Sequence, residues 1–374
     1  MSYLFQHTIT PRLNTNDPLL IQVLDGLLGT YMERVPDAKR VAELIIARGD
    51  TILNDHIAFR SIDIRSILTI FLHLGYVVQM DAATNKPFNF EQKKLTAVWL
   101  KHPNPQAPRV FVSQFRFADG SQALQDIVSK YIGAWEDPIH TLDLNNPDDI
   151  HTYLHTAQWP TPTYADYTAL QQESEYVAWV LYNKYYLNHF TLTVHALNAF
   201  GFASELVATL QAYQQSYAKQ AAPTVVADAI AMMHRKYERH FNVFNDWLVE
   251  QGFSMNMPHG KVANIAPDRC LLQSSTKAAL IDAPFKEGVH QIPGSYVEFA
   301  YRGLLDAVTA DFITQPSPIT EADIHKAERR DGFETQNANA IFESTYVGAE
   351  QASDTLPKKS TYIESCQVID DFLN

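Results

Sequence analysis

Two histidines and one glutamate occupy similar places in three short runs that alternate between polar and apolar residues. The runs are NDHIAFR at 54–60 with His56, NHFTLTV at 188–194 with His189, and SYVEFAYR at 295–302 with Glu298. Alternation over such lengths predicts half-buried β-strands. Two neutral imidazoles and one carboxylate, directed by strands into one cavity, form the ligand set of a mononuclear non-haem Fe(II) site with open coordination positions. We therefore predict that His56, His189 and Glu298 bind one metal ion.

Each of these residues also has a purely structural interpretation. The chain contains 14 histidines, so a histidine at the start of a strand can simply belong to the core. His195 lies six residues after His189, about 20 Å along an extended strand, which is too far to share an ion unless the strand breaks. Glu298 is the sharper signal, because a carboxylate between Val297 and Phe299 is costly to bury unless it is paired, hydrogen-bonded or bound to metal.

Two arginines share strand faces with the predicted ligands. Arg60 falls four residues after His56, and Arg302 falls four residues after Glu298. A metal-bound organic acid with a second carboxylate needs a fork-shaped partner of this kind. We therefore predict that Arg60 and Arg302 bind substrate. The alternative is that both arginines pair with acidic side chains at the rim of the fold.

The same order of elements follows each histidine. After His56 we expect a strand at 56–62, a helix at 64–74 ended by Gly75, and strands at 76–80, 95–100 and 110–117. The second half is expected to contain a strand at 189–196, a helix that ends before Gly252, and strands at 253–257, 269–274 and 296–301. This repeated β-α-β-β-β order resembles the vicinal oxygen chelate fold. It predicts an α+β fold in which two modules, at about 50–118 and 185–303, form an open barrel around a metal.

Helices are expected to surround the two modules. The candidates are 20–31, 41–48 and 204–218, and the segment 137–162, with several Pro, Asn and Asp residues, is the predicted linker between the halves. The C-terminal segment 315–374 begins at a turn-rich stretch and is too sparsely patterned to be a domain of its own. We therefore expect residues 1–374 to form a single catalytic unit with helical insertions.

Composition narrows the classes of partner and the compartment. The 374 residues include 29 basic and 42 acidic residues, for a net charge of −13, which argues against nucleic acid or an anionic membrane as the main partner. No apolar run approaches the roughly 18–20 residues that span a bilayer, and the N-terminus lacks the pattern of a secretion signal. Cys270 and Cys366 are the two cysteines, and such a low content favours a reducing cytoplasm. The sequence carries no signal for an oligomeric state.

The chain resembles the 2-oxoadipate dioxygenase/decarboxylase family, whose members are also called 2-hydroxyglutarate synthases, over about residues 50–345. The resemblance rests on the DHIAFR run at 55–60, NHFT at 188–191, VEF at 297–299 with Arg302, and two C-terminal runs, RDGFE at 330–334 and AIFEST at 340–345. It implies an elaborated vicinal oxygen chelate fold with one Fe(II) held by His56, His189 and Glu298, and with Arg60 at the substrate. A crystal could hold Zn, Ni or Mn in place of iron.

The resemblance also implies a reaction. A 2-oxo acid such as 2-oxoadipate would react with O₂ at the metal, lose CO₂ and leave 2-hydroxyglutarate, a step of lysine catabolism. The metal would supply the redox chemistry, and the protein would supply geometry, a dry cavity and a clamp for the far carboxylate. The partners implied are a small-molecule 2-oxo acid and O₂.

Two other classes of function stay open from the sequence. A glyoxalase-like isomerase or hydrolase on the same scaffold would use Zn(II), Ni(II) or Mn(II) with four protein ligands, two from each module. In the first module we expect Gln114 at the place that Glu298 takes in the second, so Gln114 as a ligand would favour that class. The other class is a protein that binds a metal or small molecule without turnover.

Overall fold

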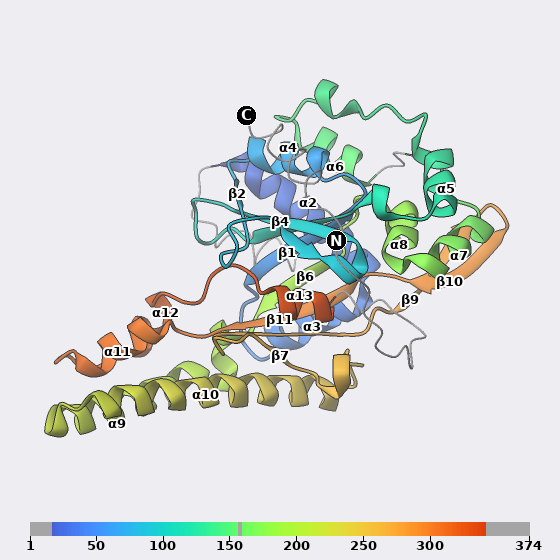
Figure 1. The fold of residues 1–374 in the computed structure, drawn as a ribbon. Helices are drawn as coiled ribbons and strands as arrows, with labels where there is room; N and C mark the ends of the chain where they lie inside the picture. Colours follow the sequence, from blue (N-terminus) through green and yellow to red (C-terminus); the bar gives the residue numbers. More distant parts are fainter. Residues whose placement is uncertain (1–16, 156–158, 342–374) are drawn as a thin grey trace.

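A nine-stranded sheet organises the molecule. The computed structural model describes residues 17–155 and 159–341, and Figure 1 shows the sheet curled at its centre with helices around it. The strand order is β2-β4-β5-β1-β6-β11-β8-β7, with β3 added to β4. Each half of this order comes from one half of the chain. The predicted α+β fold of two β-α-β-β-β modules is confirmed.

The first module provides one side of the sheet. Its elements are β1 (Asn54–Ser61), α4 (Arg65–His73), β2 (Val77–Gln79), β3 (Phe88–Phe90), β4 (Leu95–Lys101) and β5 (Arg109–Phe115). β1 pairs with β5 in parallel, and β5, β4 and β2 follow as antiparallel neighbours. Gly75 has φ of +84° just after α4, a backbone conformation that glycine adopts without strain, so the helix ends where the sequence predicts.

The second module repeats this pairing on the other side. Its elements are β6 (His189–Thr193), α9 (Phe202–Gln220), α10 (Pro223–Glu250), β7 (Asn264–Ile265), β8 (Leu271–Ser275) and β11 (Tyr296–Arg302). β6 pairs with β11 in parallel, and β11, β8 and β7 are antiparallel neighbours. A hairpin of β9 (Leu280–Phe285) and β10 (Gly288–Pro293) is inserted before β11. The modules meet where β1 and β6 pair antiparallel.

Helices pack on and around this sheet. They are α2 (Pro18–Arg34), α3 (Pro36–Ala47), α5 (Gln122–Ile132), α6 (Pro147–His155), α7 (Tyr164–Glu173), α8 (Glu175–Asn183), α11 (Asp306–Thr314), α12 (Glu321–Lys326) and α13 (Thr335–Ile341). α3 contacts β11, α8 contacts β1 and α10 contacts β8. Buried apolar residues of both modules and of these helices belong to one hydrophobic cluster. A shared core of this kind fixes the two halves of the sheet against each other.

Several predicted elements differ from the structure. No strand forms at 253–257: Met255 makes an isolated bridge with Thr276, and β7 follows at 264–265. The strand expected at 189–196 ends at Thr193, where a 3₁₀ turn begins. The segment 137–162, predicted to be a linker, instead contains a 3₁₀ turn and α6. The Asp137 carboxylate accepts hydrogen bonds from Ile139 N in the turn and from the Tyr153 hydroxyl on α6, so the turn and the helix pack together.

The helices of residues 17–155 and 159–341 differ from membrane-spanning helices. None of them combines the length and the apolar character that a membrane-spanning helix requires.

Candidate metal centre and its cavity

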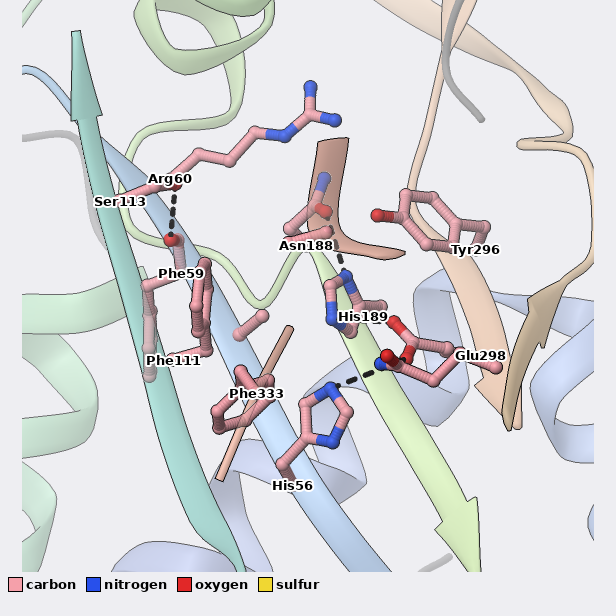
Figure 2. Close-up of a pocket in the computed structure, with 13 residues that line it drawn as sticks. His56, Phe59, Arg60, Phe111, Ser113, Asn188, His189, Tyr296, Glu298 and Phe333 are labelled. Carbon is pink, nitrogen blue, oxygen red and sulfur yellow. Dashed lines mark hydrogen bonds and ion pairs between the residues drawn. The ribbon is translucent and has the colours of Figure 1, made fainter. Parts of the chain in front are cut away.

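His56, His189 and Glu298 meet in the middle of the sheet, on three adjacent strands (Figure 2). The Glu298 carboxylate places Oε1 3.5 Å from His56 Nε2 and Oε2 3.1 Å from His189 Nε2. One donor atom from each of the three residues lies within 4.8 Å of the other two. The structure thus brings together the three residues that the sequence analysis selected.

Strand register explains this meeting. β6 lies between β1 and β11, and its Thr191 is paired with His56 on one side and with Glu298 on the other. His189 stands two residues before Thr191, so its side chain leaves the same face of the sheet. Its pairing with Ala58 brings it beside β1. Three side chains that are 133 and 109 residues apart along the chain therefore share one small volume.

The three side chains are almost completely buried, with exposed fractions of 1% for His56, 7% for His189 and 1% for Glu298. Burial lowers the pKa of His56, but the negative charges of Glu298 and Asp55 outweigh burial and hold this pKa above its ordinary value. Burial and the positive charges of His56 and Arg60 hold the pKa of His189 well below its ordinary value. The pKa values of the two imidazoles are therefore shifted in opposite directions, although both rings contact Glu298.

The residue before each histidine fixes its ring. His56 Nδ1 lies 2.8 Å from Asp55 Oδ1, and His189 Nδ1 lies 3.0 Å from Asn188 Oδ1. Because a carboxylate and an amide oxygen only accept, each Nδ1 donates a hydrogen bond, which leaves Nε2 as the ring nitrogen that can bind a metal. Both Nε2 atoms lie near the Glu298 carboxylate, and His56 Nε2 also lies 3.0 Å from Thr191 Oγ1. Metal-binding histidines are usually oriented through Nδ1 in this way.

Glu298 is held from the second module and from the C-terminal segment. Gln273 Nε2 on β8 donates to Glu298 Oε1 at 2.7 Å, and Asn337 Nδ2 on α13 donates to Gln273 Oε1 at 3.1 Å. Gln273 and Asn337 are both buried. This chain of hydrogen bonds orients the carboxylate toward the two imidazoles and connects it to α13.

A small cavity of about 20 Å³ opens next to the three side chains. Its lining residues are His56, Ala58, Phe59, Arg60, Phe111, Ser113, Asn188, His189, Gln273, Tyr296, Glu298, Phe333 and Ala338. Most of the wall is apolar or aromatic, with polar atoms at a few points. This is the composition of a site that orients a small molecule and excludes water.

Arg60 lies in this cavity wall, as the sequence analysis expected. Its side chain is 1% exposed and lies over the rings of Tyr176 and Trp179, with Cζ 5.2 Å and 5.4 Å from their centroids. Glu175 Oε1 is 3.7 Å from Arg60 Nη1. A buried guanidinium beside rings and one carboxylate is a positive charge kept at the wall of the cavity.

Arg302 is the main correction to the predicted site. It does not line the cavity, and its Nε and Nη2 donate to the two oxygens of Asp55 at 2.6 Å and 2.9 Å. Its Nη1 donates to the carbonyl oxygens of Arg330 and Gly332 at 3.0 Å and 2.8 Å. The prediction of substrate contact is wrong for Arg302, because its guanidinium is engaged behind His56. Arg302 instead positions Asp55, and through it His56.

The charge of Asp55 follows from the same contacts. Burial alone would raise the pKa of this carboxyl, but Arg302 and Arg109 outweigh burial and hold the pKa well below its ordinary value. Arg109 Nη1 lies 3.6 Å from Asp55 Oδ2. Asp55 therefore stays ionised, and the acceptor for His56 Nδ1 is a full negative charge.

Gln114 is not where the sequence analysis placed it. It pairs with Ser61, and its Oε1 accepts a hydrogen bond from Ile64 N at 3.2 Å. When His56 and His189 are taken as equivalent, the register places Phe111 of the first module at the position of Glu298. Ala58 stands two residues after His56 and pairs with Phe111, just as Thr191 stands two residues after His189 and pairs with Glu298. The first module thus offers one donor and the second offers two.

The sequence analysis assigned no role to several residues that complete the site. Phe333 lies over His56 and Phe111, with ring centroids 4.8 Å away in both cases. It is carried there by the RDGFE run, where Asp331 Oδ1 accepts from Arg109 Nε at 2.5 Å. The resemblance did include this run, but nothing local in it indicates a cavity wall. The second C-terminal run, at 340–345, lies almost wholly outside the described residues.

His195 is not part of the cluster. Its Nδ1 accepts a hydrogen bond from Arg302 N at 3.2 Å, and burial, together with the charge of Arg329, holds its pKa well below the ordinary value. It is a partly buried, neutral histidine, and its spacing from His189 already indicated that it cannot share an ion with that residue.

The donor set fits a divalent transition metal. Two neutral imidazole nitrogens and one carboxylate oxygen, with three protein ligands and an adjacent cavity, match the 2-His-1-carboxylate pattern of non-haem Fe(II) sites. Each imidazole is oriented by a neighbour through Nδ1, as metal-bound histidines usually are. The buried Glu298 carboxylate accepts a hydrogen bond from Gln273. A bound cation would further offset the cost of burying its negative charge.

Comparison with known proteins gives consistent results. The sequence model of the family described as "2-oxoadipate dioxygenase/decarboxylase" matches residues 23–313. A relative named "2-oxoadipate dioxygenase/decarboxylase, chloroplastic", from Arabidopsis thaliana, is 32% identical over 342 residues, which cover 87% of this chain and 76% of the relative.

Solved structures resemble this chain as well. The hydroxyglutarate synthase of Oryza sativa, crystallised in complex with 2-oxoadipate, has a TM-score of 0.66 at 29% identity, covering 86% of this chain and 90% of the other. A protein from Ralstonia eutropha assigned to the glyoxalase superfamily has a TM-score of 0.56 at 18% identity, covering 80% and 90% of the two chains. The second likeness concerns the fold alone.

Proposed function

This chain belongs to the 2-oxoadipate dioxygenase/decarboxylase family, and we propose that it is a metal-dependent enzyme that oxidises and decarboxylates a 2-oxo dicarboxylic acid such as 2-oxoadipate. The products would be CO₂ and the 2-hydroxy acid shortened by one carbon, 2-hydroxyglutarate in the case of 2-oxoadipate. The observation that carries the proposal is the meeting of His56, His189 and Glu298 beside a cavity that also contains Arg60.

We propose Fe(II) as the metal, held by His56, His189 and Glu298. The chemistry that a bound Fe(II) supplies is the redox coupling between the 2-oxo acid and dioxygen. The overall reaction is balanced without another reductant, because one molecule of O₂ is distributed between CO₂ and the hydroxy acid. Three protein ligands are the number that leaves positions for both reactants.

The residues of the cavity would orient the acid. Asn188 donates no hydrogen bond through its buried Nδ2 to any described residue, although its Oδ1 is used by His189. This amide donor is therefore available to an oxygen of the acid. In the view of Figure 2, Arg60, Asn188 and Tyr296 lie toward one end of the cavity, and His56 and Phe333 lie toward the other.

Arg60 would bind the far carboxylate. It stands four residues beyond His56 on β1, roughly 13 Å along the strand, and its long side chain spans part of that distance. A dicarboxylic acid anchored near the histidines would thus extend toward the guanidinium. The aromatic rings of Phe111 and Phe333 would exclude water from the reacting end of the acid, which strengthens both charge interactions.

Oxygen uptake tests the proposal most directly. The protein would be loaded with Fe(II) without oxygen and then mixed with aerated 2-oxoadipate or its shorter and longer homologues. We expect one O₂ consumed for each CO₂ and each 2-hydroxy acid formed. Turnover of a 2-oxo or 2-hydroxy acid without oxygen uptake would instead support the isomerase or hydrolase alternative, and binding without turnover would support a binding protein.

Arg60→Ala tests the assignment of the clamp. A charge-assisted contact to a carboxylate contributes about 1.5–3 kcal/mol, so affinity for 2-oxoadipate should fall about 10- to 100-fold. Affinity for a monocarboxylic 2-oxo acid of similar length should change little. Arg60→Lys should restore binding only in part, because an ammonium lacks the planar fork.

The matched control is Arg65→Ala. Arg65 lies on the outside of α4, where it pairs with Asp63 and is more than half exposed, so its loss should leave both affinities unchanged. Equal losses for the dicarboxylic and monocarboxylic acids in Arg60→Ala would remove Arg60 from the substrate site.

We also propose a cytoplasmic location, supported by the low cysteine content. The relative from Arabidopsis thaliana is named as chloroplastic, so fractionation of cells that express the full chain is the relevant measurement. Recovery of the protein in an organelle fraction would contradict this proposal without affecting the proposed reaction.

A further inference from the structure

A second group of metal-binding side chains lies outside the cavity. It consists of His234 on α10, Cys270 immediately before β8, and Asp306 at the start of α11. His234 Nε2 is 2.8 Å from Asp306 Oδ1 and 3.6 Å from Cys270 Sγ. Within residues 17–155 and 159–341, this group and the central one are the two places where three such donors lie within 4.8 Å of one another. The two groups share no residue.

The orientation of His234 distinguishes a metal site from a catalytic relay. In a nucleophile–histidine–carboxylate relay, the carboxylate holds one ring nitrogen and the nucleophile contacts the other. Here the thiol and the carboxylate both lie at Nε2. This arrangement is that of a metal site, in which the thiol, the imidazole nitrogen and the carboxylate can all bind one shared ion.

One of these two distances already agrees with a tetrahedral ion. Zinc binds sulfur at about 2.3 Å and nitrogen or oxygen at about 2.0–2.2 Å, so donors on one tetrahedral zinc lie roughly 3.4–3.7 Å apart. The separation between Cys270 Sγ and His234 Nε2 is already 3.6 Å. The separation between His234 Nε2 and Asp306 Oδ1 is 2.8 Å, shorter than this range. The Asp306 side chain is 54% exposed, so it can move away from the ring to the required distance and leave room for a water molecule as fourth ligand.

The charges around Cys270 also favour a cation. Cys270 is buried, and the negative charges of Asp306 and Asp268 act on it. The same two carboxylates attract a divalent ion, which would replace the thiol proton as metal binding to cysteine does.

We propose that His234, Cys270 and Asp306 form a second, structural metal site for a zinc-type divalent cation, with water as the fourth ligand. The site joins three elements that are far apart in sequence, namely α10, the start of β8 and the start of α11. It stands next to Asp268, which accepts from Arg330 Nε at 2.9 Å, and so adjoins the base of the segment that carries Phe333. The ion would hold these elements together and take no part in the reaction at the cavity.

Cobalt(II) is the probe that separates this site from the central one. A cobalt–thiolate bond gives an intense near-ultraviolet charge-transfer band, whereas the central group contains no sulfur. Anaerobic titration of the full chain should give this band, and Cys270→Ser should abolish it. Cys366→Ser is the matched control, because it removes the other cysteine of the chain, which lies outside the described residues, and should leave the band unchanged.

The band decides the proposal in either direction. Absence of the band in the wild-type chain, or its loss in Cys366→Ser with retention in Cys270→Ser, would overturn the site. Loss in Cys270→Ser alone, together with a decrease of one bound cobalt per chain, would establish it. His189→Ala should keep the band, so failure of the central site would not be confused with failure of this one.

Thermal unfolding gives an independent measurement. An ion that binds the folded chain raises the unfolding temperature by mass action. Zinc should therefore raise the unfolding temperature of His189→Ala, in which the central site is damaged, and this rise should disappear when Cys270→Ser is added. An equal rise with and without Cys270 would contradict the proposed site.

Discussion

The two halves of the sheet have the same order of strands but different side chains at equivalent places. His56 in the first half is oriented by a charged carboxylate, Asp55, whereas His189 in the second half is oriented by a neutral amide, Asn188. Glu298 and Asp55 outweigh burial and hold the pKa of His56 above the ordinary value, whereas burial and the positive charges of His56 and Arg60 hold that of His189 well below it. One backbone pattern thus presents two histidines of different electrostatic character.

The second difference concerns the last strand of each half. Glu298 projects into the cavity from β11, and Phe111 takes the equivalent place on β5. Phe333 packs against Phe111, so the position of a possible fourth ligand is filled by two aromatic rings. The comparison shows how a duplicated scaffold produces a three-donor site: one half supplies a carboxylate, and the other supplies an apolar wall.

Glu298→Gln should have the largest effect of the changes that test this comparison. It removes the one charged donor with little change of shape, so metal affinity and turnover should fall by more than the roughly 10- to 100-fold that outer-shell partners contribute. Metal content after dialysis and oxygen uptake measure the two quantities. Circular dichroism checks the fold, and full metal content in a folded variant would refute the role of Glu298.

Phe111→Glu makes the first half resemble the second. A fourth donor should retain the metal but occupy a coordination position that a catalytic site keeps open, so turnover should fall by more than about tenfold. Metal analysis and oxygen uptake on the same sample separate the two effects. Phe111→Leu, which keeps the wall apolar, should retain most of the activity; equal losses in both variants would show that shape, not coordination, is limiting.

Replacing the residue that orients each histidine should have a smaller effect on metal affinity. Asp55→Asn removes the negative acceptor of His56, and metal affinity should fall about 10- to 100-fold. It also leaves the buried guanidinium of Arg302 without its carboxylate, so the free energy of unfolding should fall by about 3–5 kcal/mol. Denaturant unfolding measures the second effect.

Asn188→Ala is the control for that comparison, because it removes a neutral partner and breaks no buried ion pair. It should weaken metal binding with a much smaller loss of stability. Equal losses of stability in Asp55→Asn and Asn188→Ala would contradict the importance of the pair between Asp55 and Arg302.

The smallest effect is expected where the C-terminal segment contacts the first half. Burial would raise the pKa of Asp331, but Arg109 and Lys101 outweigh burial and hold it below the ordinary value. A carboxyl with a lowered pKa in the folded state stabilises it above the unfolded pKa of about 3.9 and loses that contribution as the pH falls. Hydrogen exchange at residues 329–335 should therefore accelerate from about pH 5 to about pH 3, after correction for intrinsic exchange. Asp331→Asn should exchange faster at pH 5 and lose this dependence.

Much of the site was predictable because its signals are local. The run at 54–60 predicted a strand at 56–62, close to β1 (Asn54–Ser61), and the cost of burying Glu298 singled it out on β11. The expectation that these strands are half-buried was wrong, because β1 and β11 are buried on both faces. The repeat of β-α-β-β-β elements could also be recognised from the sequence, because alternation and helical periodicity depend on neighbours in the chain. Even so, the two-residue strand β7 was misplaced, since so short an element has almost no pattern of its own.

The sequence by itself determined which residue types stand on which strands, and therefore that two imidazoles and a carboxylate were available. Only the tertiary structure decided which side chains share a cavity. Strand register placed Phe111, not Gln114, opposite the second half's Glu298, and a shift of one residue reverses the face of every side chain. Long-range packing turned Arg302 toward Asp55 and brought Phe333 across from the C-terminal segment. Such contacts join residues more than 200 positions apart, and no local pattern encodes them.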